Sequence, residues 1–248
     1  MAEHIKHLSD SLAPWGGFEV LRRLDGGRRN LVFLVRGDGD RRLVAKTTTR
    51  SQAALAWAAA LQQEARRAGI GAPCYIAAPD GRFAPGGLTL EPFADGRPAT
   101  QAELWGLKPG LARLRARSGG WPQRPGFASV TELFAAGAGG DVDLTLMPKS
   151  VATACLAAWA PLLGRREAPI HGDLNSSNLL LGTDGKPVLL DWDEARRDSP
   201  LFDIAPFRPD LPILARARLA WEVAAGWRSE PGYAKALAER LLAQREEA

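Results

Sequence analysis

The sequence predicts an α+β protein of two lobes, a small antiparallel sheet in the N-terminal lobe and a mainly helical C-terminal lobe. Three short β-rich runs, at 18–24, 30–35 and 42–46, are separated by turns rich in Gly and Asp. After residue 99 most of the regular patterns are helical. The break at 91–96 then divides the chain into lobes at 1–93 and 94–248.

One long helix is predicted in the N-terminal lobe, over residues 50–68. Leucine and alanine recur on one face of this segment, and Gly69 follows as a stop signal. Glu64 is the only carboxylate between Asp40 and Asp80. Its side chain is therefore either the local partner of a nearby lysine or an ordinary surface glutamate.

Helix starts in the C-terminal lobe are marked by two capping boxes, at 100–103 and 129–132, where a hydroxyl and a carboxylate each satisfy an orphan backbone donor. We expect the first helix to continue toward 117 and further helices at 151–163, 211–227 and 232–244. The Gly/Pro-rich segments 118–127 and 137–147 are longer than ordinary loops that join helices in a compact domain. They either cover a binding site as a lid or are mobile.

Composition excludes several classes of protein. At 248 residues and 46% hydrophobic, the chain can bury a sizeable core, and it has neither an apolar leader nor a membrane-length apolar run. Its two cysteines are isolated, as expected for reduced, buried thiols. The net charge of +4 comes from arginines spread along the chain, whereas residues 171–203 carry seven acidic and three basic side chains. We therefore expect a cytoplasmic protein that binds no nucleic acid.

The stretch 170–203 carries most of the chemistry. Two apolar runs, 179–181 and 188–190, flank a turn that ends in Asp-Gly, which is a hairpin signal. The hairpin should bring Asp173 and Asn178, before its first strand, beside Asp191, after its second. Oxygen ligands of this kind suit a hard cation such as Mg²⁺, which takes substrate phosphates as further ligands.

At these residues the sequence resembles a known family. His171-Gly172-Asp173-Leu174 with Asn178 is similar to the protein-kinase catalytic loop with Gly in place of Arg. Together with Asp191-Trp192-Asp193, it resembles the aminoglycoside phosphotransferase and choline kinase superfamily. The resemblance implies a bilobal protein-kinase-like fold.

The resemblance also implies roles for these side chains. Asp173 would be the catalytic base that orients the acceptor hydroxyl, and Asn178 and Asp191 would be the metal ligands for Mg²⁺. His171 and Asp203 would brace the loop, Asp203 lying in a Ser-Pro-Leu-Phe-Asp-Ile-Ala run similar to the family's pattern. Asp193 joins either the metal site or the acceptor site.

The expected ATP site lies mostly in the N-terminal lobe. Gly26, Gly27 and Asn30 form a turn that resembles the family's nucleotide loop, although it lacks the protein-kinase glycine pattern and two-glycine turns are common. Lys46 follows Leu43-Val44-Ala45, where a kinase places its phosphate-binding lysine. Glu64 is the candidate partner of Lys46.

The segment 91–96 resembles the hinge between kinase lobes. An adenine needs one backbone acceptor and one backbone donor there, and Glu91 and Phe93 are expected to supply them, because the usual contacts alternate along a strand. A plain turn at this place is the alternative.

The function implied by the resemblance is transfer of the ATP γ-phosphoryl group to an alcohol of a small molecule. The acidic composition of 171–203 favours a cationic, aminoglycoside-like or choline-like acceptor. A sugar kinase or homoserine-type kinase of the same fold is the alternative, as is a nucleotide-binding pseudokinase or regulatory module. A protein kinase is disfavoured, since little room for an activation segment separates 193 from 203. No protein partner is evident.

Overall fold

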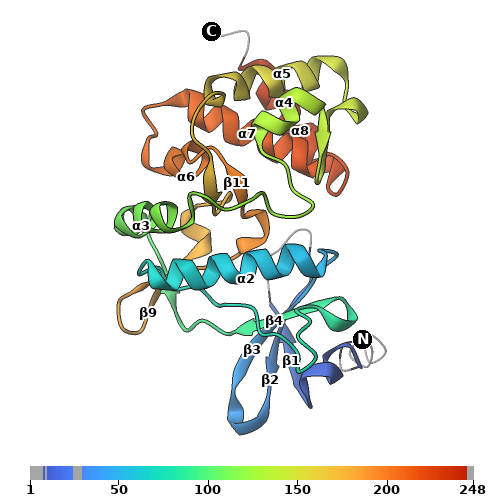
Figure 1. Cartoon of the computed structure of the whole chain (residues 1–248), viewed down its shortest axis with the longest axis vertical. Coiled ribbons are helices and arrows are strands. Elements are labelled where there is room, and N and C mark those ends of the chain that lie inside the picture. The colour runs from blue at the N-terminus through green and yellow to red at the C-terminus, as the bar shows by residue number, and fades with distance from the viewer. Residues whose placement is uncertain (1–7, 9, 25–29, 245–248) are drawn as a thin grey trace. The chain divides into compact units, whose positions relative to one another are not determined.

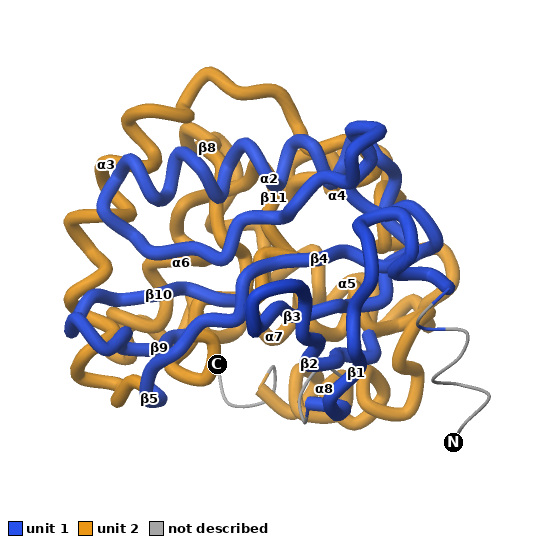
Figure 2. The backbone as a smooth tube through the Cα atoms, turned by 90° about the horizontal axis from the view of Figure 1, so that it is seen from below, with its two compact units in different colours: residues 1–98, 179–190 blue, residues 99–178, 191–248 orange. Residues whose placement is uncertain are grey.

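The computed structural model describes residues 8, 10–24 and 30–244, and it divides the chain into two compact units. Unit 1 comprises residues 1–98 and 179–190, and unit 2 comprises 99–178 and 191–248 (Figure 2). The first boundary lies at 98 rather than the expected 93. The hairpin expected in the C-terminal lobe belongs instead to unit 1.

A four-stranded antiparallel sheet in the order β1-β2-β3-β4 forms the base of unit 1. Its strands are β1 (Glu19–Arg23), β2 (Val32–Arg36), β3 (Arg42–Thr47) and β4 (Leu88–Pro92). The three strands expected at 18–46 are confirmed, and the fourth adds the short apolar run at 88–90. One buried cluster, from the sheet and the segment before it, consists of Leu8, Leu12, Val35, Leu43, Ala45, Leu88 and Leu90.

The predicted long helix of unit 1 is α2 (Gln52–Arg67), capped by the Ser51 side chain, which accepts from the Ala54 N–H at 3.2 Å (Figure 1). Gly69 follows with φ of 84°, which glycine adopts without strain. The apolar face expected from the sequence is buried: Leu55, Ala58, Leu61 and Ala65.

Gln62 is a buried polar residue on the same helix. Its side chain is fully buried, donating to the Pro73 carbonyl at 3.3 Å and accepting from the Tyr75 N–H at 3.0 Å. Both bonds satisfy backbone groups of an irregular segment that forms no ladder of its own. Gln62 therefore ties residues 73–75 to α2.

The hairpin predicted at 179–190 is present. Strands β9 (Leu179–Gly182) and β10 (Pro187–Leu189) pair antiparallel, and β5 (Gly96–Pro98) adds to the other edge of β9. Gly71 bonds to the residues before and after Val188 in β10, donating to the Pro187 carbonyl at 2.9 Å and accepting from the Leu189 N–H at 2.8 Å. A Cβ on Gly71 would lie 2.8 Å from the Pro187 carbonyl oxygen, so only glycine fits.

Unit 2 is mainly helical and is built around α5, α7 and α8, whose side chains form its core. Both capping boxes form, but the one at Thr100 precedes a 3-10 turn (Glu103–Leu107) before the helix proper begins. Two short strands, β8 (Ala168–Ile170) and β11 (Arg196–Asp198), pair antiparallel. The helices are α3 (Lys108–Ser118), α4 (Val130–Ala136), α5 (Lys149–Trp159), α6 (Leu201–Ile204), α7 (Pro212–Gly226) and α8 (Pro231–Ala243).

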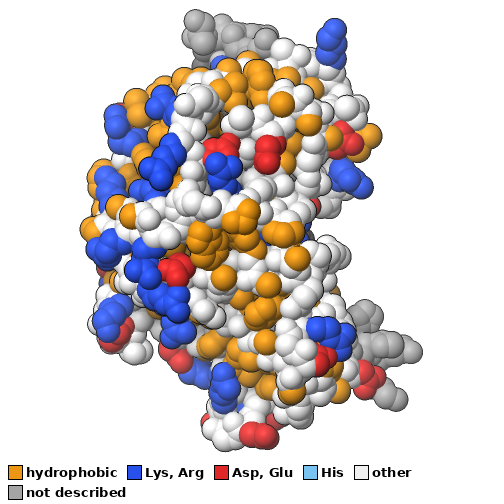
Figure 3. Space-filling model, viewed as in Figure 1, with side chains coloured by type: hydrophobic (Ala, Val, Ile, Leu, Met, Phe, Trp, Pro, Cys, Tyr) orange, Lys and Arg blue, Asp and Glu red, His pale blue; other side chains and the backbone are white. Residues whose placement is uncertain are grey.

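Basic side chains gather around α3 on the face shown in Figure 3. The helix carries Lys108, Arg113, Arg115 and Arg117, and the Lys108 ammonium lies 3.6 Å from the centre of the Trp105 ring. Such a cation–π contact attracts the ammonium to the face of the exposed tryptophan ring. In the part of the chain that the structure describes, no helix combines the length and apolarity needed to cross a bilayer.

Gln62 should be worth more to stability than its surface counterpart on the same helix. Gln62→Ala leaves the buried Tyr75 N–H and Pro73 carbonyl unsatisfied, so we expect a loss of about 1–3 kcal/mol in the free energy of unfolding. Gln52 makes the same pair of bonds, to the Gly81 carbonyl and the Phe83 N–H, but is exposed. Gln52→Ala is the matched control, and equal losses in urea titration would contradict this account.

Candidate active site

The hairpin positions the two ends of the site. Leu179 pairs with Leu189, so the chain enters the hairpin from Asn178 and leaves it through Leu190 into Asp191. Asp173, Asn178 and Asp191 all belong to unit 2. The Asp191 carboxylate lies close enough to Asp173 to raise its pKa. Asp173 thus contacts Asn178 and lies near Asp191, and the expected metal site of Asn178 and Asp191 stays a prediction.

Two asparagine side chains hold the Asp173 carboxylate. Asn178 Nδ2 donates to Asp173 Oδ2 at 2.9 Å and to the Asp173 carbonyl at 3.0 Å. Asn175 Nδ2 donates to Asp173 Oδ1 at 3.0 Å and to the same carbonyl at 3.1 Å. These bonds turn the Asn178 amide nitrogen toward Asp173 and leave Oδ1 as the amide atom suited to ligate a cation.

Asp203 braces the loop that carries Asp173. Its buried carboxylate accepts from the His171 N–H at 2.8 Å and from the Gly172 N–H at 3.0 Å. The His171 ring is itself buried, packs edge-on against Trp192, and its Nδ1 accepts from the Asp173 N–H at 3.4 Å. Asp203 and His171 thus hold the backbone on either side of Gly172.

Gly172 is required by both its backbone and its surroundings. Its φ is 85°, and a Cβ would lie 2.4 Å from the Glu194 carbonyl oxygen and 2.9 Å from Arg196 Nη1. No side chain fits at this distance. The loop can therefore approach the 194–196 backbone only because the residue before Asp173 is glycine.

Asp191 has an unusual backbone for a residue with a side chain, φ 57° and ψ 68°. Such left-handed conformations cost of order 1 kcal/mol and persist where the surroundings over-determine them. Here the next turn is held by Arg124, a fully buried side chain whose Nη1 donates to the carbonyls of Asp193 and Ala195, both at 2.9 Å. The third acceptor is the Trp192 carbonyl at 3.3 Å.

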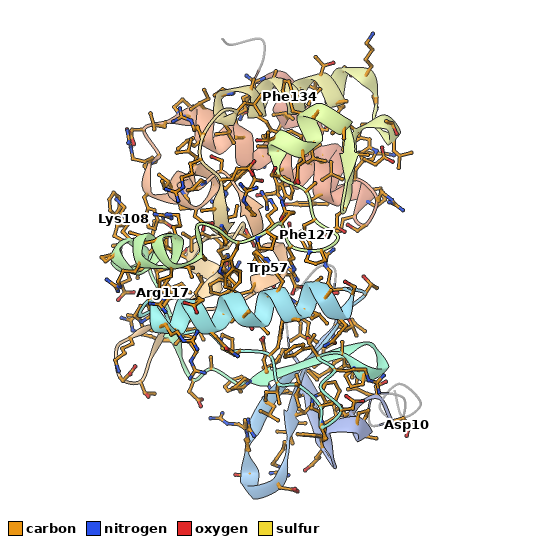
Figure 4. All side chains as sticks on the ribbon, viewed as in Figure 1. Asp10, Trp57, Lys108, Arg117, Phe127 and Phe134 are labelled. Atoms are coloured by element: carbon orange, nitrogen blue, oxygen red, sulfur yellow. The ribbon has the colours of Figure 1, made fainter. Side chains whose placement is uncertain are left out.

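Residues 123–127 are anchored by these contacts. Besides Arg124, the Gln123 amide donates to the Arg197 carbonyl at 2.8 Å and accepts from its N–H at 2.9 Å. The Arg124 guanidinium also lies 4.2 Å from the centre of the Phe127 ring, on the loop between α3 and α4 (Figure 4). The part of 118–127 around Gln123 and Arg124 is thus a fixed support for the 191–197 backbone.

Several carboxylates near the site are engaged within the protein. Arg196 Nε donates to Asp198 Oδ2 at 2.8 Å, and both side chains are fully buried. Burial raises the pKa of Asp198, against the lowering effect of Arg196. The Trp221 indole N–H donates to Glu194 Oε2 at 3.0 Å, and Arg197 pairs with the Glu167 carboxylate.

Asp173 is electrostatically distinct. Burial raises the pKa of its carboxyl, and the Asp191 carboxylate raises it further. His171, the Arg218 guanidinium and the Asn178 hydrogen bond act in the opposite direction, and the net shift is upward. A carboxylate with a raised pKa is a better proton acceptor, which suits a general base.

The residues present fit a magnesium ion bound together with phosphates. Among the described residues, no group of three or more His, Cys, Asp or Glu side chains could hold a metal. Mg²⁺ usually takes only one or two protein carboxylates and completes its shell with water and substrate phosphates. Asp191 and the amide oxygen of Asn178 match this requirement.

The residues expected to bind the nucleotide belong to unit 1. Lys46 lies on β3, half-buried, between Val32 on β2 and Thr89 on β4. Asn30 is half-buried before β2, whereas Gly26 and Gly27 lie outside the described residues. Glu64 accepts a hydrogen bond from Arg67 on the same helix, and its pairing with Lys46 stays a prediction.

The hinge differs from the expected alternation by one residue. The Phe93 N–H donates to the Arg42 carbonyl at 3.2 Å, and Glu91 pairs with Val44, so backbone groups of 91 and 93 are directed toward β3. The opposite edge carries the Leu90 carbonyl, which accepts from the Ile76 N–H at 2.7 Å. Because backbone groups alternate along a strand, the next carbonyl on that edge is that of Pro92. As a proline, Pro92 offers an acceptor there but no N–H donor.

Sequence reasoning missed four residues of this site. Asn175 carries a weak signal, since an Asn two residues after an Asp in a loop often bonds back to it. Gln123, Arg124 and Arg218 come from distant segments, and nothing in their neighbourhoods marks them. Arg218 Nη2 lies 3.5 Å from Asp173 Oδ1.

The raised pKa of Asp173 predicts a gain in stability on its neutralisation. A carboxyl whose pKa is higher in the folded than in the unfolded state destabilises the fold as pH rises through that interval. The difference in melting temperature between Asp173→Asn and wild type should therefore shift in favour of the variant as pH rises from 3 to 7, whatever the constant cost of replacing one acceptor oxygen by an amide NH2. Asp184→Asn is the control, because Lys186 lowers the pKa of that exposed carboxyl and the sign reverses. Thermal melts across pH test both.

Comparisons with known proteins bear on the fold of the chain. A macrolide 2'-phosphotransferase, MphH from Brachybacterium faecium, matches at 18% identity with a TM-score of 0.58, over 97% of each chain. The aminoglycoside phosphotransferase APH(4)-Ia matches at 14% identity and TM-score 0.65 over 98% of each chain. Choline kinase LicA from Streptococcus pneumoniae matches at 13% and 0.61, over 98% of this chain and 99% of that one.

These likenesses show a kinase-like fold. A search of curated proteins by sequence returns no match. The profile of a family described as "Phosphotransferase enzyme family" matches residues 20–238, which is most of the chain. With its kinase-like fold, the chain belongs to the phosphotransferase enzyme family.

Proposed function

We propose that the protein is a small-molecule kinase that transfers the γ-phosphoryl group of ATP to a hydroxyl of a small alcohol. The observation that carries the proposal is the Asp173 carboxylate, held by Asn175 and Asn178 on a loop whose backbone Asp203 fixes. Phosphoryl transfer demands positioning and charge neutralisation more than covalent chemistry by the protein. A rigidly held carboxylate with a raised pKa is suited to the first task.

In the proposed reaction Asp173 orients the acceptor hydroxyl and takes its proton. Asn178 and Asp191 hold Mg²⁺, which when bound neutralises phosphate charge. Lys46 contacts the phosphates, and the Pro92 carbonyl replaces the Glu91 and Phe93 groups as the adenine-facing acceptor on β4. One solved neighbour, a mutant of APH(4)-Ia with 16% identity and TM-score 0.57, is a ternary complex with ADP and hygromycin B, which supports ATP as the donor.

The proposed acceptor is a cationic small alcohol, and an uncharged sugar is the alternative. Asp173, Asp191 and Asp193 support the cationic acceptor. Asp198 and Asp203 are fully or almost fully buried and engaged inside the protein, which reduces the acidic charge counted from the sequence. The pairing of Arg196 with Asp198 is the observation that favours an uncharged acceptor.

Loss of Asp191 tests the metal and the reaction together. Asp191→Asn should lower turnover by at least about 100-fold and raise the Mg²⁺ concentration for half-maximal rate, because a neutral amide binds the cation more weakly. ADP release during an acceptor screen measures the rate, and circular dichroism checks the fold. Asp210→Asn, on an exposed pair with Arg208, is the control. Near wild-type turnover in Asp191→Asn would mean that the metal binds elsewhere.

Salt decides between the two acceptor classes. If the acceptor is cationic, its KM should rise several-fold between low and physiological ionic strength, because salt screens attraction between an exposed site and a charged ligand. The KM of a neutral sugar should stay flat. Aminoglycosides, choline, sugars and homoserine form the screening panel. Faster turnover of an uncharged member than of any amine would contradict the proposal of a cationic acceptor and would leave the kinase proposal intact.

A further inference from the structure

Arg218 places a positive charge beside the proposed base. Its Nη2 lies 3.5 Å from Asp173 Oδ1, and its side chain is 20% exposed, against 40% for Asp173. It comes from α7, 45 residues further along the chain. The function proposed so far assigns it nothing.

The helix that presents Arg218 is firmly packed. Ala217, Ala220 and Trp221 on neighbouring positions are buried, and the Trp221 indole bonds to Glu194. The Arg196 guanidinium stacks on the Trp221 ring, 3.3 Å from its centre. Side chains presented by packed helices are more accurately placed than side chains on loops.

A purely structural role accounts poorly for this arginine. A partly exposed ion pair at 3.5 Å contributes at most about 1 kcal/mol. Trp221, one turn further along α7, already ties the helix to the site.

We propose that Arg218 is a further catalytic residue, which stabilises the transferring phosphoryl group; this inference rests on the proposed function. The acceptor oxygen must lie within hydrogen-bond reach of Asp173, and the γ-phosphorus about 3–3.5 Å beyond it. A guanidinium has five N–H donors in a planar fork. One donor at Asp173 therefore leaves others within reach of phosphoryl oxygens.

The proposed reaction develops negative charge that the Arg218 guanidinium can stabilise. The bond between the γ-phosphorus and the bridging oxygen breaks, and that oxygen leaves on ADP with the electron pair. A bond from the acceptor oxygen to phosphorus forms, and the acceptor's proton passes to the Asp173 carboxylate. Negative charge is spread over the three equatorial oxygens during transfer, and an arginine that donates to them accelerates phosphoryl transfer by about 10³-fold or more in GTPases.

Binding of a transition-state mimic provides a test that does not depend on turnover. Calorimetry measures the affinity for MgADP and for MgADP with aluminium fluoride, which mimics the phosphoryl group in the transition state. The affinity of Arg218→Ala for MgADP should stay within about twofold of wild type. The factor by which aluminium fluoride increases that affinity should be about 100-fold smaller than in wild type. Arg218→Lys should recover part of it. Arg208→Ala, which breaks an exposed Arg–Asp pair, is the matched control and should keep the gain.

A double-mutant cycle separates direct contact from an effect through the base. In the Asp173→Asn background, Arg218→Ala should still lower the affinity for the fluoride complex if Arg218 contacts the phosphoryl group. No further loss there would make it a positioning residue for Asp173 and overturn the proposal. So would retention of the fluoride gain in Arg218→Ala, or no gain in wild type. Failure of wild type to bind MgADP would instead refute the kinase function itself.

Discussion

The geometry of the site depends on one buried carboxylate, that of Asp203. By accepting two consecutive backbone N–H groups it holds His171 and Gly172 in a conformation that neither helix nor sheet provides. The left-handed Gly172 then sends the chain close under the 194–196 backbone, where no other residue fits. Asp173 follows directly. Its position is therefore set by a partner 30 residues away rather than by its own neighbours.

Local patterns predicted most of the framework. The strands before residue 47, the helix capped by Ser51, the hairpin at 179–190 and the helices at 149–159, 212–226 and 231–243 all follow from periodicity, caps and turn chemistry. These signals act over a few residues, so the sequence contains them directly. The juxtaposition of Asp173, Asn178 and Asp191 was also within reach, because a short hairpin joins them.

What the sequence could not supply depends on contacts between distant segments. Arg124 and Arg218 reach the site from other parts of unit 2. In an arginine-rich chain, the sequence does not indicate which residues a given arginine contacts. The backbone groups of Glu91 and Phe93 are directed toward β3, which was not foreseen because strand alternation depends on the register between β3 and β4, and composition does not reveal that register. The anchoring of Gln123 and Arg124 was not predicted for the same reason, since these side chains bind backbone groups about 70 residues away.

The membership of β9 and β10 in unit 1 bears on how the protein is made. Among the described residues, strand β5 and Gly71 find their strand partners in residues 179–190. During synthesis the ribosome must therefore produce three quarters of the polypeptide before the first unit is complete, and most of the second unit's sequence intervenes. Neither unit corresponds to one continuous stretch of the gene. A truncation after residue 98 would leave β5 and Gly71 in the N-terminal fragment without these partners, and an unpaired strand edge favours aggregation.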